Sequence, residues 1–162
     1  MGMLLQVGSM AKRSIMALQT HIFSYMDKYT HKVSLRIWHP KLTAEEISDE
    51  LQLEPCLTQT VGQKMKTPKG DLLENICSET FWLHKFIASS PILNLEDFLN
   101  EITNLLSYKS NFLNLVTSTG GRSELFCGIF LNTNMGVDLD NQLMKKITDL
   151  SLSVGLDIYI PE

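Results

Sequence analysis

The chain has 162 residues, of which 44% are hydrophobic and 20% charged, and its formal charge at pH 7 is −4. This length suits one domain with its own core, and the composition excludes a disordered or collagen-like chain. A net negative charge argues against binding to duplex nucleic acid or to an anionic membrane, so neither is expected as a partner. No apolar run approaches the roughly 20 residues of a membrane-spanning helix.

The three cysteines, Cys56, Cys77 and Cys127, are widely spaced and form no CxxC pair. An odd number of cysteines cannot all be paired in disulfides, which favours a reducing compartment. We therefore expect a cytoplasmic protein.

Residues 1–28 are interpreted as an N-terminal extension. Its first 25 residues carry Lys12 and Arg13 and no acid, but the segment lacks the continuous apolar core and the cleavage site of a targeting signal. The alternatives are an additional amphipathic helix over residues 9–25 or an upstream extension of the natural domain. Residues 29–162 are then predicted to form a single α+β domain.

The domain begins with a predicted strand followed by a helix. Apolar and polar residues alternate over 33–38, which is typical of a strand with one face in the core. Thr43 and Glu46 have the spacing of a capping box and predict the start of a helix, and Pro55 prevents that helix from continuing.

Residues 56–78 show little periodicity and predict a long loop, with a short strand near Thr60. The loop contains a basic cluster, Lys64, Lys66 and Lys69. We interpret this cluster as a solvated loop tip, because it lacks the glycine-rich turn and following helix of a phosphate site.

The remaining elements alternate between strands and helices. In chain order they are a strand over 80–86, a helix over 95–106 capped by Asn94, strands over 111–117 and 123–131, a helix capped by Asp138 or Asp140, and a strand over 154–160. Gly120 and Gly121 suit a hairpin turn between the two consecutive strands.

The predicted order is β-α-β-α-β-β-α-β, with an optional helix in front. Each helix has one apolar stripe, so the helices have to cover one face of a sheet. We predict an α+β two-layer sandwich of ferredoxin-like character, with about five strands in a mixed or antiparallel sheet and helices on one face.

Five segments carry a resemblance to a known family: the strand SLRI, the helix LTAEEISDELQLEP, KGD at residues 69–71, the strand FWLHKF and the terminal strand LDIYI. Together they resemble the bacterial domain-of-unknown-function family 4279 over about residues 29–160. The resemblance implies a small cytoplasmic bacterial protein in which Pro55, Gly70 and Trp82 serve the architecture. It supplies no catalytic residues.

The strand pattern predicts a candidate binding surface. If the aliphatic residues of the first and last strands face the helices, their polar and aromatic neighbours face away from them. Aromatic residues and arginine dominate interface hot spots, so this open face is the candidate for recognition. It would carry Arg36, Trp38, Trp82, His84, Asp157 and Tyr159, with Asn114 on the third strand. The alternatives are that Trp38 or Trp82 is buried, and that Arg36 and Asp157 form only a cross-strand ion pair.

No catalytic residues, metal ligands or cofactor are predicted. The sequence has no GxSxG, HExxH or Walker motif, and His31, His39 and His84 lack ligand spacing with each other or with a cysteine. An aromatic sheet face also resembles RNA-recognition domains, but the net charge and the lack of a basic, glycine-flanked aromatic motif argue against that function.

The sequence therefore favours a non-enzymatic interaction module that binds a protein partner or a second copy of the chain. An immunity-type protein, which neutralises a toxin, is one version of it. The alternative is a small-ligand sensor or an enzyme with a pocket between the 56–78 loop and the sheet. In that case Arg36, His84 and Tyr159 would be the polar anchors.

Overall fold

The computed structural model describes residues 29–67, 70–90, 93–132, 134 and 136–160. The helix predicted over residues 9–25 lies outside the described residues, as does Lys69 of the basic cluster. None of the helices in the described part of the chain is long and apolar enough to cross a membrane.

The fold is built on a five-stranded sheet with the order β2-β5-β1-β6-β7. The central strand β1 pairs antiparallel with β5 and β6, whereas β7 pairs parallel with β6, so the sheet is mixed. Its strands are β1 (Tyr29–His39), β2 (Leu57–Gln59), β5 (Thr80–Lys85), β6 (Arg122–Leu131) and β7 (Leu152–Tyr159).

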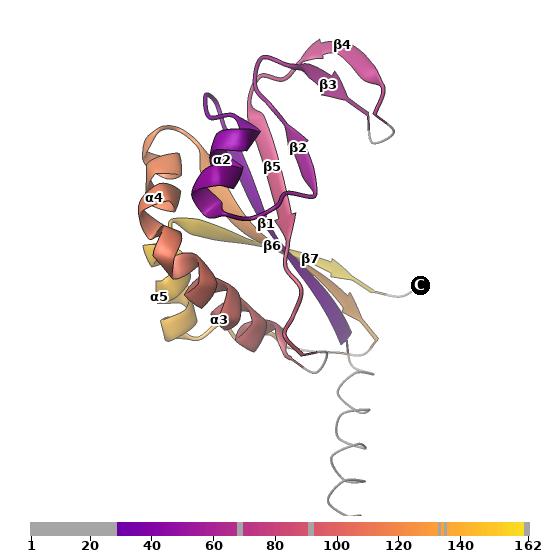
Figure 1. Ribbon diagram of the computed structural model, residues 1–162. Coiled ribbons are helices and arrows are strands. Elements are labelled where there is room, and N and C mark those ends of the chain that lie inside the picture. Colours follow the sequence, from indigo (N-terminus) through magenta and orange to yellow (C-terminus); the bar gives the residue numbers. More distant parts are fainter. Residues whose placement is uncertain (1–28, 68–69, 91–92, 133, 135, 161–162) are drawn as a thin grey trace, which may run out of the picture.

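All helices of the described chain lie on one face of this sheet (Figure 1). They are α2 (Ala44–Leu51), α3 (Leu95–Leu106), α4 (Ser110–Ser118) and α5 (Asn141–Asp149), with a single 3-10 turn, Ser107–Lys109, joining α3 to α4. The predicted two-layer α+β sandwich with five strands and one helical layer is confirmed. Its ferredoxin-like character remains a prediction.

The predicted start of α2 is also confirmed. The backbone N–H of Glu46 donates to Oγ1 of Thr43 over 3.2 Å, and the Thr43 N–H donates to the Glu46 carboxylate over 2.7 Å. This reciprocal pair satisfies two backbone donors that the first helical turn leaves free. The helix ends at Gln52, whose φ of +57° is left-handed.

The core lies between the sheet and the helices. Leu35 and Ile37 of β1 are fully buried there, together with Leu99 of α3 and Leu125 of β6. Leu156 and Ile158 of β7 point toward the same side, since they pair with Cys127 and Ile129, but about half of each side chain is exposed. The helical layer therefore covers only the first part of β7, where Leu152 is buried.

The strand predicted over residues 111–117 is wrong, because these residues belong to helix α4. The buried residues of α4 are Phe112, Leu113 and Val116, which are spaced by one and three positions and lie on one helical face. Leu115, which an alternating strand would bury with Leu113, is half exposed. Gly120 and Gly121 consequently connect α4 to β6 rather than turning a hairpin.

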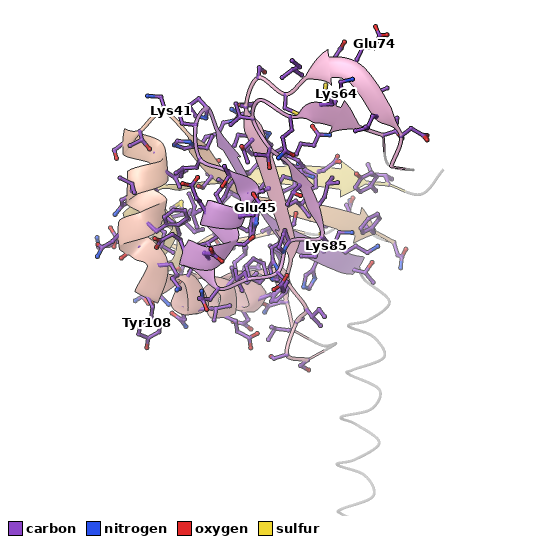
Figure 2. The ribbon with its side chains drawn as sticks, turned by 45° about the horizontal axis from the view of Figure 1, so that its top comes forward. Lys41, Glu45, Lys64, Glu74, Lys85 and Tyr108 are labelled. Carbon is purple, nitrogen blue, oxygen red and sulfur yellow. The ribbon has the colours of Figure 1, made fainter. Side chains whose placement is uncertain are left out.

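The 56–78 segment is more ordered than predicted. It contains β2, which confirms the short strand near Thr60, but also a separate antiparallel hairpin of β3 (Lys64–Lys66) and β4 (Leu72–Ile76). The hairpin stands beside one end of the main sheet (Figure 1), and the side chains of Lys64 and Glu74 on it extend into solvent (Figure 2).

Candidate binding surface on the open face of the sheet

The sheet face opposite the helices, called the open face below, is identified by strand register. Residues directly paired across strands share a face. Arg36 pairs with Leu83 and Glu124, and Trp38 pairs with Phe81 and Arg122, whereas Leu35 and Ile37, which alternate with them on β1, are buried in the core. The predicted placement of Arg36 and Trp38 away from the helices is therefore confirmed.

The last strand also follows the prediction. Asp157 pairs with Gly128 and Tyr159 with Phe130, and the rings of Tyr159 and Phe130 stack with centroids 4.7 Å apart. The Tyr159 hydroxyl donates to the Asp157 carboxylate. This hydrogen bond to a negative group, aided by burial, raises the pKa of Tyr159 and keeps its hydroxyl protonated.

The placement of Trp82 and His84 on the open face is wrong. Trp82 pairs with Ile37 and is fully buried under α2, where its indole N–H donates to Oγ of Ser48 over 2.9 Å. His84 pairs with Leu35, and its Nδ1 lies 2.6 Å from the Glu54 carbonyl oxygen. The two residues share a parity as predicted, but the register turns that parity toward the helices.

Asn114 is likewise on the helical side, because it belongs to α4. Its carboxamide oxygen accepts a hydrogen bond from the Ser151 hydroxyl over 2.6 Å. It contributes nothing to the open face.

Arg36 is held in place by two neighbours on β6. Its Cζ lies 3.4 Å from the centroid of the Phe126 ring, and its Nη1 lies 3.6 Å from Oε2 of Glu124. The ion pair is thus made with Glu124 and not, as the sequence-based alternative had it, with Asp157. Gly155 makes room for it, since a Cβ there would lie only 2.6 Å from Oε1 of Glu124. The guanidinium is therefore fixed before any ligand arrives.

A hollow of about 370 Å³, called the groove below, lies beside Arg36 on the open face. Ser34 and Gly128 form its floor. Both residues are small, so little side chain rises above the backbone at these two positions. Its walls are formed mainly by Lys32, Leu83, Lys85, Phe126, Phe130 and Tyr159. This depression can take up one or two apolar side chains.

A second aromatic cluster occupies the other end of the open face. The rings of Trp38 and Phe81 are 5.3 Å apart, and the guanidinium carbon of Arg122 lies 4.4 Å from the Trp38 ring centroid. Two hydrogen bonds of 2.9 and 3.0 Å join this guanidinium to the Glu79 carboxylate. Trp38 is thus held between an aromatic ring and a fixed cation.

A hollow of about 380 Å³ separates this cluster from the β3–β4 hairpin, in the region where the sequence predicted a pocket. Its walls include Trp38, Phe81, Met65, Ile76, Cys77 and Glu79. The predicted polar anchors Arg36, His84 and Tyr159 are not among its lining residues, and the structure does not bring these three together in one site.

Phe126, Phe130 and Lys32 also belong to this surface, although the sequence pattern was not used to place them there. A usable signal was present, because Phe126, Gly128 and Phe130 alternate with the buried residues 125, 127 and 129. Within the described residues, no group of three or more His, Cys, Asp or Glu side chains is arranged to hold a metal ion.

Comparison with the curated proteins and with the solved structures gave no match. A family model does match, over residues 27–161, which includes every element of the sheet and of the helical layer. It is described as a domain of unknown function, DUF4279. The chain belongs to the DUF4279 family.

Proposed function

We propose that the chain is a non-enzymatic protein-binding module that recognises its partner with the open face of the sheet. The observation that carries this proposal is a sheet face without a helical cover in the described structure, on which Trp38, Phe126, Phe130 and Tyr159 are at least partly accessible. Aromatic side chains and arginine are the residues that contribute most to protein interfaces.

The rigidity of this surface supports binding. Its side chains project from paired strands, and Arg36 and Arg122 are already fixed by ring contacts and carboxylates. Ordering a side chain at an interface costs about 0.5–1.5 kcal/mol, and a surface ordered in advance avoids much of that cost.

The cytoplasm is the compartment that we propose for this function, because Cys56, Cys77 and Cys127 are all free thiols. An immunity-type protein that covers a toxin is one version of such a module. A neighbouring gene that encodes a toxin would support this version.

Site-specific photo-crosslinking tests the proposal. A benzophenone amino acid is introduced at Leu83 on the open face, and at Tyr108 in the helical layer as the matched control. Tyr108 is 91% exposed and points away from the sheet, whereas Lys85, the neighbour of Leu83 on the open face, extends from the opposite side (Figure 2). We expect a defined crosslinked partner from Leu83 and none from Tyr108. Crosslinking of the same protein from both positions would refute the proposal.

The partner identified in this way, which includes a second copy of the chain, is then purified and titrated. Trp38→Ala should weaken its binding by at least about 30-fold, the effect of losing a hot-spot aromatic residue worth 2 kcal/mol or more. Tyr108→Ala should leave the Kd unchanged. Equal affinity of wild type and Trp38→Ala would remove the open face as the binding site.

The hollow next to the hairpin supports a second candidate, a small-ligand sensor. Its volume of about 380 Å³ lies within the range of small-molecule sites, about 300–1,000 Å³, and apolar side chains predominate in its lining. In an NMR fragment screen, ligands of this site should shift the amide signals of Ile76 and Cys77. A screen that shifts only signals around Phe126 would exclude this second candidate.

A further inference from the structure

The distribution of charge around the groove differs from that of the whole chain. The protein has a formal charge of −4, but among the described residues the charged side chains that line the groove are those of Lys32, Arg36 and Lys85, and no described carboxylate lines it. The groove therefore concentrates positive charge beside largely apolar walls.

The two lysines of the groove are accessible to a ligand. Lys32 and Lys85 are exposed, and neither forms a salt bridge within the described part of the chain. The Nζ of Lys32 lies 5.3 Å from the centroid of the Phe130 ring at the groove wall. Arg36 is less accessible, because its side chain is 27% exposed and its Nε is buried, without a hydrogen-bond partner among the described residues.

Two described acids that neighbour residues of the groove are already engaged. Glu124 faces Arg36 at 3.6 Å, and Asp157 accepts a hydrogen bond from Tyr159. Glu124 lies on β6 and Asp157 on β7. Of the three cations, Lys32 and Arg36 lie on β1, and Lys85 is the last residue of β5. An incoming carboxylate on the β1 and β5 side would thus meet two unpaired lysines.

The shape of the groove limits what can enter it. A volume of about 370 Å³ suits one or two side chains rather than a folded surface. In an extended segment alternate side chains point the same way, about 6.6–6.8 Å apart, so apolar side chains can enter the groove while flanking carboxylates reach Lys32 and Lys85.

We infer that the groove binds an extended acidic segment of the partner, in which aspartate or glutamate residues flank an apolar or aromatic anchor. This inference rests on the proposed function, because it names the chemistry of the partner at one part of the open face. Charge complementarity selects the acidic segment, and the apolar walls select its anchor.

A peptide selection tests the inference. The full chain is used to select binders from a phage library of random nine-residue peptides, and the best peptides are synthesised and titrated. We expect sequences in which aspartate or glutamate flanks an apolar or aromatic residue. Replacing their acids by the corresponding amides should weaken binding at least tenfold, and higher salt should weaken the parent peptides in the same direction.

Two variants connect the peptides to the groove. Lys32→Glu combined with Lys85→Glu changes two exposed charges and should weaken binding at least tenfold. Gly128→Val fills the floor, where an added Cβ would lie 3.6 Å from the Phe130 ring and 3.8 Å from that of Tyr159, which is ordinary contact. It should abolish binding without unfolding the protein, and circular dichroism checks the fold.

The outcomes separate the inference from the proposed function. Neutral or basic peptides that Gly128→Val blocks would overturn the acidic chemistry but leave the open face as the binding surface. Acidic peptides that bind both variants with wild-type affinity would overturn the groove as their site. Binding of dodecanoate in the groove, with no peptide selected, would replace the acidic segment by a small apolar carboxylate and overturn the inference.

Discussion

Replacing Ser48 by alanine tests whether Trp82 supports the fold rather than recognition. The Trp82 indole is fully buried, and the Ser48 hydroxyl that receives its N–H donates in turn to the Ala44 carbonyl over 3.0 Å. Ser48→Ala leaves this N–H without a partner, which costs about 1–3 kcal/mol. Alanine offsets about 0.5 kcal/mol of the loss, because it is the better helix former. We expect the free energy of unfolding to fall by about 0.5–2.5 kcal/mol.

The assay is urea unfolding at 25 °C and pH 7.5, followed by far-ultraviolet circular dichroism. At this chain length 1 kcal/mol corresponds to about 2–4 °C in Tm, so a thermal scan should show a fall of about 1–10 °C. Ser118→Ala is the matched control, since that exposed hydroxyl donates only to the Leu115 carbonyl of its own helix. Its effect should stay within about 0.5 kcal/mol.

A double-mutant cycle with Trp82→Phe isolates the hydrogen bond. Phenylalanine has no N–H, so Ser48→Ala should cost almost nothing in the Trp82→Phe background. An equal loss of stability in both backgrounds would show that Ser48 acts in another way. A stable Ser48→Ala single variant would show that the buried N–H does not need this partner.

Three further predictions concern stability and thiol chemistry. Gly121→Ala should destabilise the fold by about 1–3 kcal/mol in urea unfolding. The added Cβ would lie 2.5 Å from Cδ2 of His39 and 2.7 Å from the Trp38 carbonyl oxygen, which is too close. A variant with wild-type stability would contradict this close approach. Burial, followed by the charge of a neighbouring lysine, lowers the pKa of His39 below 6.5. Below pH 6.5 the unfolded state therefore binds more protons, so the stability that His39 contributes is present above pH 6.5 and is lost as pH falls through the lower folded pKa; His39→Gln should flatten the fall measured between pH 7.5 and 5. Ellman's reagent should label the exposed Cys56 rapidly and the buried Cys77 and Cys127 slowly. Burial also raises the pKa of Cys127 to about 12, which keeps its thiol protonated. Rapid labelling that survives in Cys56→Ser would contradict this assignment.

Local sequence rules predicted the elements whose signals are local. The capping box of Thr43 and Glu46 placed the start of α2 correctly, because both partners lie within one helical turn. The strand over 111–117 failed because Val116 and Thr117 favour strands locally, whereas packing buries Phe112, Leu113 and Val116 together on one helical face.

The open face could be predicted only in part. Arg36 and Trp38 were placed correctly because alternation along β1 shows which parity is buried. Residues 81–83 are all apolar, so β5 has no such alternation, and the face of Trp82 depends on its pairing with Ile37. A shift of this register by one residue would reverse the result, and the sequence of one strand does not determine its register against another.

The central position of β1 has a consequence for synthesis on the ribosome. Ser34 has to pair with Lys85 on one side and with Phe126 on the other, and both partners are translated later. At about 5–20 residues per second, the nascent strand waits several seconds before its second neighbour emerges. During this interval the apolar side of β1 is a natural client surface for chaperones, and shortened chains that stop before β6 should be prone to aggregation.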